Sequence, residues 1–172
     1  MKYTSSLDKL ARGLTIGITT LFLAIIAGQF FVFKQSDAVV TVSVTVGLVL
    51  GYLVVFVFRP VNYYVLNDKV IIHRPIKDVI IDKKNISTIE LLDRKRLRGA
   101  IHLFGVGGLF GYFGIFGNAS VGRMTWYATR LDRAVLITTI TKQKIVLTPD
   151  EPVAFMIAVK TSNGNDVGKR KK

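Results

Sequence analysis

The 172-residue sequence contains no cysteine, which excludes disulfide bonds, thiolate metal sites and a cysteine nucleophile. Histidine is almost as scarce, since His73 and His102 are the only two. Metal sites need three or four convergent ligands, so we assign both histidines structural roles. No pair of carboxylates stands out for acid-base chemistry, and no phosphate-binding glycine motif or nucleophile motif is present. The sequence therefore predicts no enzyme, no cofactor and no metal site.

Charged residues are missing from two long apolar runs, Gly13 to Phe33 and Ala38 to Phe58. At about 1.5 Å per residue each helix would span roughly 31 Å, close to the thickness of a bilayer core. No cleavage site follows the first run and a second run comes at once, which argues against a signal peptide. We predict transmembrane helices at 13–33 and 38–59, joined by a short external loop at 34–37. Because no ionisable residue lies at membrane depth, a proton-coupled transporter or ion pump is disfavoured.

Small residues recur four apart in both predicted helices. In lipid such positions mark faces where helices approach closely. A tight connector places residue i opposite a residue near 71 minus i, which brings the two stripes to matching depths. We expect this helix-packing seam to be formed by Ala24, Gly28, Ser43, Gly47 and Gly51. The alternative is that the Gly47 and Gly51 pair joins two protomers.

The charge is strongly positive, +13 overall, and its distribution predicts an orientation. Residues 1–12 carry +2, residues 34–38 carry none, and residues 59–172 carry +11. By the positive-inside rule both termini face the cytoplasm, as expected for a multi-pass protein of the inner membrane. A charge this large also implies an anionic partner, for which the bilayer is the simplest candidate.

Beyond Val61 the hydrophobic period changes from helical to alternating, which is typical of strands. Strand candidates are residues 62–66, 69–73, 78–82, 86–90, 124–129, 134–141 and 144–147. Thr148-Pro149-Asp150-Glu151 has the pattern of a capping box with proline at the first helical position, so a helix is expected from there to about Gly164. Residues 163–172 are expected to form a basic, disordered tail.

A glycine recurs every third residue from Gly105 to Gly117, interleaved with aromatic residues. Three interpretations stay open: a wedge inserted in the membrane interface, a hairpin that packs on the domain's own core, or a groove for a partner protein. The aromatic residues expected to form this interface or partner loop are Phe104, Phe110, Phe113 and Phe116.

The densest internal basic cluster consists of Arg94, Lys95, Arg96 and Arg98. If this segment is extended, the three arginines share one face because side chains alternate along a strand. The cluster would then contact an anionic leaflet or another anionic partner, or it would be a solvated sheet edge. Nucleic acid is disfavoured, because no cation is interleaved with the aromatic residues between 104 and 116.

The segments 104–118, 127–129, 135–139 and 144–150, together with the first hairpin at 63–74, resemble the bacterial pleckstrin-homology (PH-like) domain family. The resemblance implies an all-β domain over residues 60–162, with two near-orthogonal antiparallel sheets of about seven strands and a capping C-terminal helix. Phosphoinositide-binding members carry several basic residues in the loop of the first hairpin. Here that loop, Leu66 to Lys69, is short and has one lysine, so this activity is not carried over.

We therefore expect a membrane helical hairpin that anchors a PH-like binding or scaffold module at the cytoplasmic face. Its partners would be the lipid bilayer, anionic lipid headgroups, and a membrane protein or a second copy of the chain. The alternative is an accessory or regulatory subunit of a larger membrane transport or envelope complex.

Overall fold

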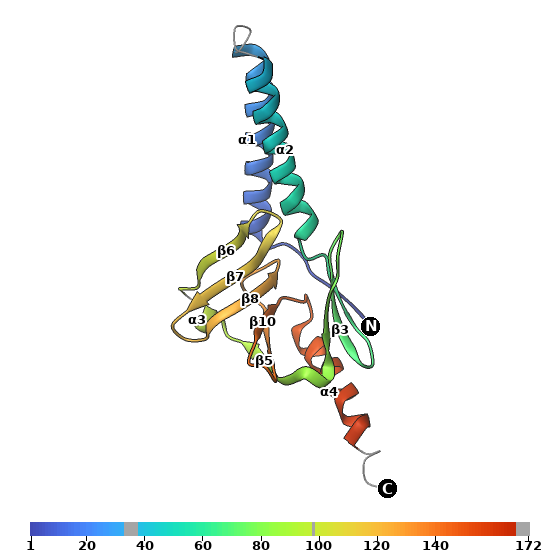
Figure 1. The fold of residues 1–172 in the computed structure, drawn as a ribbon. Helices are drawn as coiled ribbons and strands as arrows, with labels where there is room; N and C mark the ends of the chain where they lie inside the picture. The colour runs from blue at the N-terminus through green and yellow to red at the C-terminus, as the bar shows by residue number, and fades with distance from the viewer. Residues whose placement is uncertain (33–37, 98, 168–172) are drawn as a thin grey trace.

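The computed structural model describes residues 1–32, 38–97 and 99–167, without the side chains of residues 30–32, 94 and 162–167. Two long helices project from one end of a β domain, and the C-terminal helix lies at the opposite end (Figure 1). The helices are α1 (Lys9–Val32), α2 (Ala38–Phe58), α3 (Arg94–Leu97), α4 (Pro152–Val167) and the 3-10 turn η1 (Lys83–Asn85). The strands are β1 (Lys2–Thr4), β2 (Asn62–Val65), β3 (Lys69–His73), β4 (Val79–Asp82), β5 (Ile86–Leu92), β6 (Ile101–Gly108), β7 (Gly111–Asn118), β8 (Gly122–Ala128), β9 (Ala134–Thr139) and β10 (Lys144–Leu147).

Helices α1 and α2 are long and apolar enough to cross a membrane. Their mean hydropathies over the candidate spans are 1.9 and 2.4, and almost none of either span is buried by protein. A helix that is apolar on every side and uncovered by protein is stable when lipid surrounds it. The chain therefore has two candidate membrane spans, at the positions expected from the sequence.

The two helices meet through a different face from the one predicted. Thr19 and Tyr52 share a 2.9 Å hydrogen bond, which fits the expected register, and Thr45 donates a 2.9 Å bond to the buried Gln29. Ala24, Ser43, Gly47 and Gly51 are exposed, and a Cβ built at Gly28, Gly47 or Gly51 would have no neighbour within 4 Å. The contact between the helices is thus formed by these polar pairs and by the rings of Phe22 and Tyr52, 6.0 Å apart, and not by the small residues.

The segment before the first helix belongs to the β domain, which the sequence did not predict. Strand β1 pairs antiparallel with β2, with Lys2 opposite Tyr64 and Thr4 opposite Asn62. The terminal amino group donates to the carbonyl oxygen of Val65, and the Val65 amide donates back to Met1. The chain on both sides of the helical hairpin thus contributes to one sheet.

Helix α1 begins at Lys9, earlier than the predicted Gly13, because Asp8 caps it. Oδ1 of Asp8 accepts a 2.7 Å hydrogen bond from the Ala11 amide, which is the geometry of an N-cap. Its other oxygen accepts from the Leu131 amide, and the Asp8 amide donates to the Thr129 carbonyl. The start of the helix is therefore fixed to the loop that follows β8.

The strands form two sheets with the orders β1-β2-β3-β4 and β5-β9-β10-β8-β7-β6. This confirms the PH-like fold class of two sheets and a C-terminal helix. The described residues contain ten strands where about seven were expected, since β1 lies before the helices and the glycine-rich segment forms two strands. One pair, β8 with β10, is parallel, and all the others are antiparallel.

The buried hydrophobic residues form two clusters. One contains Phe155 and Val159 of α4 together with residues of both sheets, and the other surrounds Trp126 in the six-stranded sheet. The predicted capping box at Thr148 does not start this helix, which begins at Pro152 and continues past Gly164 to Val167. The Thr148 hydroxyl instead accepts a hydrogen bond from the Thr129 amide. The Asp150 carboxylate accepts hydrogen bonds from the amide and the hydroxyl of Ser6. Contacts with the N-terminal segment thus replace the local cap. Residues 168–172 of the predicted tail lie outside the described residues.

The glycine repeat forms the hairpin of β6 and β7, one of the three predicted alternatives. Gly105 and Gly114 face each other across it, with φ angles of 119° and 126°. A Cβ on Gly114 would lie 2.2 Å from the carbonyl oxygen of Phe104. Glycine is therefore required here because two backbones approach closely in a conformation that other residues rarely adopt.

Replacing Gly114 by alanine should lower the free energy of unfolding by about 2 kcal/mol or more, because strained backbone and overpacking each cost about 1–3 kcal/mol. Gly107→Ala is the matched control in the same hairpin, since a Cβ there meets open space. It should change stability by less than about 0.5 kcal/mol. Unfolding in detergent can be followed by fluorescence of Trp126, the one tryptophan, which is buried. Equal losses for the two variants would contradict the close approach.

Candidate functional site

The predicted basic cluster is not an extended face. Residues Arg94 to Leu97 form the helical turn α3, so the expected alternation of arginines on one side is wrong. The carboxylate of Asp93 accepts the Lys95 amide, and such local bonding favours a helical turn over a strand. Arg96 pairs with Glu90 at 3.2 Å, and Lys95 is exposed. The Arg94 side chain and the whole of Arg98 lie outside the described residues.

The four aromatic residues predicted as an interface loop separate into buried and exposed groups. Phe113 and Phe116 are buried, and Phe116 stacks on Trp126 with ring centroids 4.4 Å apart. Phe104 is 75% exposed on β6, which is the edge strand of the six-stranded sheet. The structure therefore assigns most of this stretch to the core and leaves Phe104 on the surface.

Phe110 lies at the turn between β6 and β7 and joins the β domain to the second helix. Its ring makes edge contacts with Tyr52 and Phe56, at 5.3 and 5.4 Å. The Arg59 guanidinium lies over the rings of Phe56 and Phe110, at 4.1 and 5.3 Å from their centroids. A cation over aromatic faces is stabilised most where water is excluded. This cluster packs the β6–β7 turn against the last turns of α2, at the end where Figure 1 shows the helices meeting the β domain.

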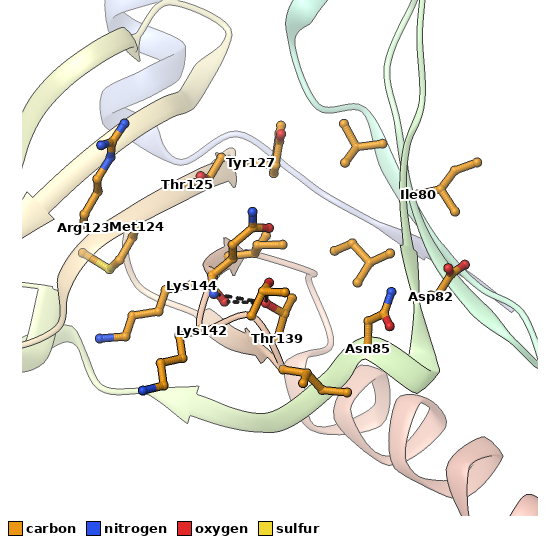
Figure 2. A pocket seen from close by; sticks show the side chains of 16 residues that line it. Ile80, Asp82, Asn85, Arg123, Met124, Thr125, Tyr127, Thr139, Lys142 and Lys144 are labelled. Atoms are coloured by element: carbon orange, nitrogen blue, oxygen red, sulfur yellow. Dashed lines mark hydrogen bonds between the residues drawn. The ribbon is translucent and has the colours of Figure 1, made fainter.

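A cleft of about 750 Å³ lies between the two sheets. One wall is β4, whose outer edge has no paired strand among the described residues. The facing wall is β8 with the turn that joins β9 and β10 (Figure 2). Its volume falls within the range of small-molecule and peptide sites. The side chains that line both walls include Ile80, Ile81, Asp82, Asn85, Met124, Thr125, Tyr127, Thr139 and Gln143.

Three cations stand on the rim of the cleft: Arg123, Lys142 and Lys144. The Lys144 ammonium donates to the carbonyl oxygen of Val121. Arg123 and Lys142 make no ion pair among the described residues. Figure 2 shows that the charged ends of all three point outward at one side of the cleft, away from its centre. Sequence reasoning missed this group because Arg123 lies on β8, about 20 residues before the two lysines of the β9–β10 turn and the start of β10.

Tyr127 lines the cleft, and its burial raises the pKa of the phenol, an effect that the nearby Arg74 partly opposes. The phenol therefore stays neutral at physiological pH. A neutral hydroxyl can both donate and accept a hydrogen bond. The mixed apolar and polar walls, and a strand edge with no described partner, suit the binding of a small molecule or an extended segment.

The two histidines have structural neighbours in the β domain. His73 Nδ1 lies 2.8 Å from Asp78, and the His102 ring packs on Phe116 at 4.9 Å. In the described part of the chain no group of three or more histidine, aspartate or glutamate side chains is placed to hold a metal ion.

Comparison with known proteins identifies the β domain. The family model described as "Bacterial PH domain" matches residues 61–163, more than half of the chain. No curated protein and no solved structure gives a significant match. The matched region contains both walls of the cleft, the β6–β7 hairpin and the first part of α4. The two sheets followed by a C-terminal helix agree with that assignment. The chain therefore belongs to the bacterial PH domain family.

Proposed function

We propose that this protein is a membrane-anchored PH-like binding module, held at the cytoplasmic face of the inner membrane by the hairpin of α1 and α2. The observation that carries the proposal is the pairing of β1 with β2. It puts the chain before the first helix and the chain after the second helix in one folded domain. A hairpin that spans the membrane must then have both ends on the same side.

The exposed surface of the helices supports membrane anchoring. Large apolar side chains such as Leu23 and Val42 are more than half exposed along the hairpin. In water this surface would favour aggregation, whereas lipid makes it stable. The polar groups within the spans pair with each other, as Gln29 does with Thr45. The positive charge of the domain, against the neutral connector, supports the cytoplasmic side.

PH domains generally bind lipids or proteins, and the two ends of this domain suit different partners. The cleft walls of β4 and β10 extend toward the end of the domain remote from the helices (Figure 1), which favours a protein partner there. The outer edge of β4 offers backbone hydrogen bonds to an extended segment of that partner. Exposed Phe104 and Lys95 remain candidates for lipid or partner contact.

The phosphoinositide mode of other PH domains is not supported. The turn between β2 and β3, which corresponds to the basic loop of those domains, lies at the end of the sheet remote from the helices (Figure 1). The salt bridge of its Lys69 with Asp68 is long, at 3.9 Å, and exposed. A headgroup of the anchoring membrane would not reach this turn.

The alternative function is an accessory subunit of a larger membrane complex. It is favoured by the outward glycines of α2, Gly47 and Gly51, since small residues let another helix approach closely. That partner helix would belong to a transport or envelope protein, or to a second copy of this chain.

Cysteine labelling tests the anchoring and its orientation, and the native chain has no cysteine to interfere. Ser36→Cys in the connector and Ile140→Cys on the β domain would be treated with a membrane-impermeant maleimide on intact cells whose outer layer is permeable to it. We expect labelling at position 36 alone, and at both positions after lysis. Labelling at 140 but not at 36 would invert the orientation. Labelling at both before lysis would exclude a membrane-spanning hairpin.

Purification in mild detergent separates the two functions. Arg123 and Lys142 make no ion pair among the described residues, so they can pair with anionic groups of a partner. If a protein that co-purifies in fixed stoichiometry binds at the cleft rim, charge reversal of these two residues should abolish its co-purification. It should be lost on Gly47→Leu if the chain is a subunit docked through α2. Val46→Leu is the control for the helix, and Lys160→Glu on the exposed face of α4 is the control for charge. Loss with Gly47→Leu alone would overturn the binding-module proposal.

A further inference from the structure

The turn between β3 and β4 presents an apolar residue at its tip. Ile76 is 75% exposed and is flanked by the exposed Pro75 and Lys77. Lys77 makes no ion pair among the described residues. An exposed isoleucine alone is common on protein surfaces. An isoleucine beside an unpaired cation, however, matches the interface of a phospholipid bilayer, where apolar chains lie just beneath charged headgroups.

The turn is held in a fixed conformation by its own side chains. Oδ1 of Asp78 accepts the Arg74 amide at 3.2 Å and lies 2.8 Å from His73 Nδ1. The Arg74 Nε atom donates a 2.7 Å bond to the Lys77 carbonyl. These bonds close both ends of the turn around Pro75 and Ile76. Little conformational entropy would be lost when such a preformed tip meets its partner.

The turn lies beside the end of the second apolar helix. The Arg74 guanidinium is 5.4 Å from the ring centroid of Phe58, the last residue of α2, and 5.8 Å from that of Tyr127. Figure 1 shows the turn that follows β3 rising to the level at which α2 ends. Because α2 leaves the apolar layer at Phe58, this level is that of the lipid headgroups. The turn thus continues the surface through which the hairpin would meet lipid.

We propose that the β3–β4 turn is a second membrane contact, in which Ile76 inserts into the boundary of headgroups and acyl chains while Lys77 contacts lipid phosphates. This proposal rests on the proposed function, since it needs the hairpin to span the bilayer. It gives the domain two points of attachment, the hairpin and the turn. Since the domain is already fixed to its helices, two points of attachment restrict the tilt of the whole molecule in the bilayer, and the remote end of the cleft is held toward the aqueous phase.

Fluorescence quenching in the full-length protein tests the contact. A single cysteine at Ile76, Ile140 or Val46 would carry an environment-sensitive fluorophore in vesicles of neutral lipid mixed with anionic phosphatidylglycerol. Ile140 is the matched control, being 65% exposed in the turn between β9 and β10. Val46, in the middle of α2, reports the hairpin itself. Emission from buried Trp126 would verify that each labelled variant is folded.

At position 76 we expect strong quenching by nitroxide placed near the headgroups and at least threefold weaker quenching by aqueous iodide than at position 140. Lys77→Glu should raise iodide access at position 76 in anionic vesicles. If position 76 is as open to iodide as position 140 while position 46 is shielded, the turn is not a membrane contact and the anchoring proposal stands. If position 46 is also open to iodide, the anchoring proposal fails as well.

Discussion

The antiparallel pairing of β1 with β2 is the interaction on which the rest of the molecule depends. It joins residues separated by the whole helical hairpin, and it is reinforced by a network of hydroxyl groups. Ser5 bonds to Tyr63 and, at 2.7 Å, to Thr129, while the Thr148 amide donates to Tyr63. Tyr63 is fully buried, and this burial raises the pKa of its phenol, although its hydrogen bonds oppose the shift. The N-terminal segment therefore supplies part of this buried network, since Ser5 and Ser6 both bond to the Thr129 hydroxyl.

This closure also fixes the domain relative to the helices. Asp8 caps α1 and binds the loop after β8, Phe110 packs on α2, and Arg130 bridges Asp132 and Asp150 beside Ser6. The hydrogen bond from Arg130 lowers the pKa of Asp132, so this ion pair persists at neutral pH. Three separate connections leave one orientation of the β domain against the hairpin. Its apolar turns then lie near the helix ends, while the cleft extends away from them.

Much of this architecture was predictable from the sequence. The apolar runs indicated both helices, because uncharged stretches of that length are typical of membrane spans and rare elsewhere. Alternating hydrophobicity indicated most of the strands after residue 61, and β10 and β3 lie within the predicted bounds. Strand β1 escaped prediction because three residues carry no periodic signal and their partner is about 60 positions away. The same long-range segment displaced the local cap at Thr148, since Ser6 binds Asp150. The candidate site residues were harder to predict than the strands. Arg123 and Lys142 are far apart in the sequence, and the parallel pairing of β8 with β10 brings them to the same rim of the cleft.

A cysteine pair at Thr4 and Asn62 measures this closure most directly. Met1 and Val65 exchange both backbone hydrogen bonds, so Thr4 and Asn62, three residues along, form a non-hydrogen-bonded pair with Cα atoms about 4.5 Å apart. That distance suits a disulfide. Mild oxidation of the full-length protein in membranes should form the bond within one chain and raise the unfolding temperature. Thr4 with Ile80, on the opposite edge strand of the sheet and more than about 14 Å away, is the control and should not link. Failure to link Thr4 with Asn62 within one chain would contradict the closure of the domain by the segment that precedes the helices.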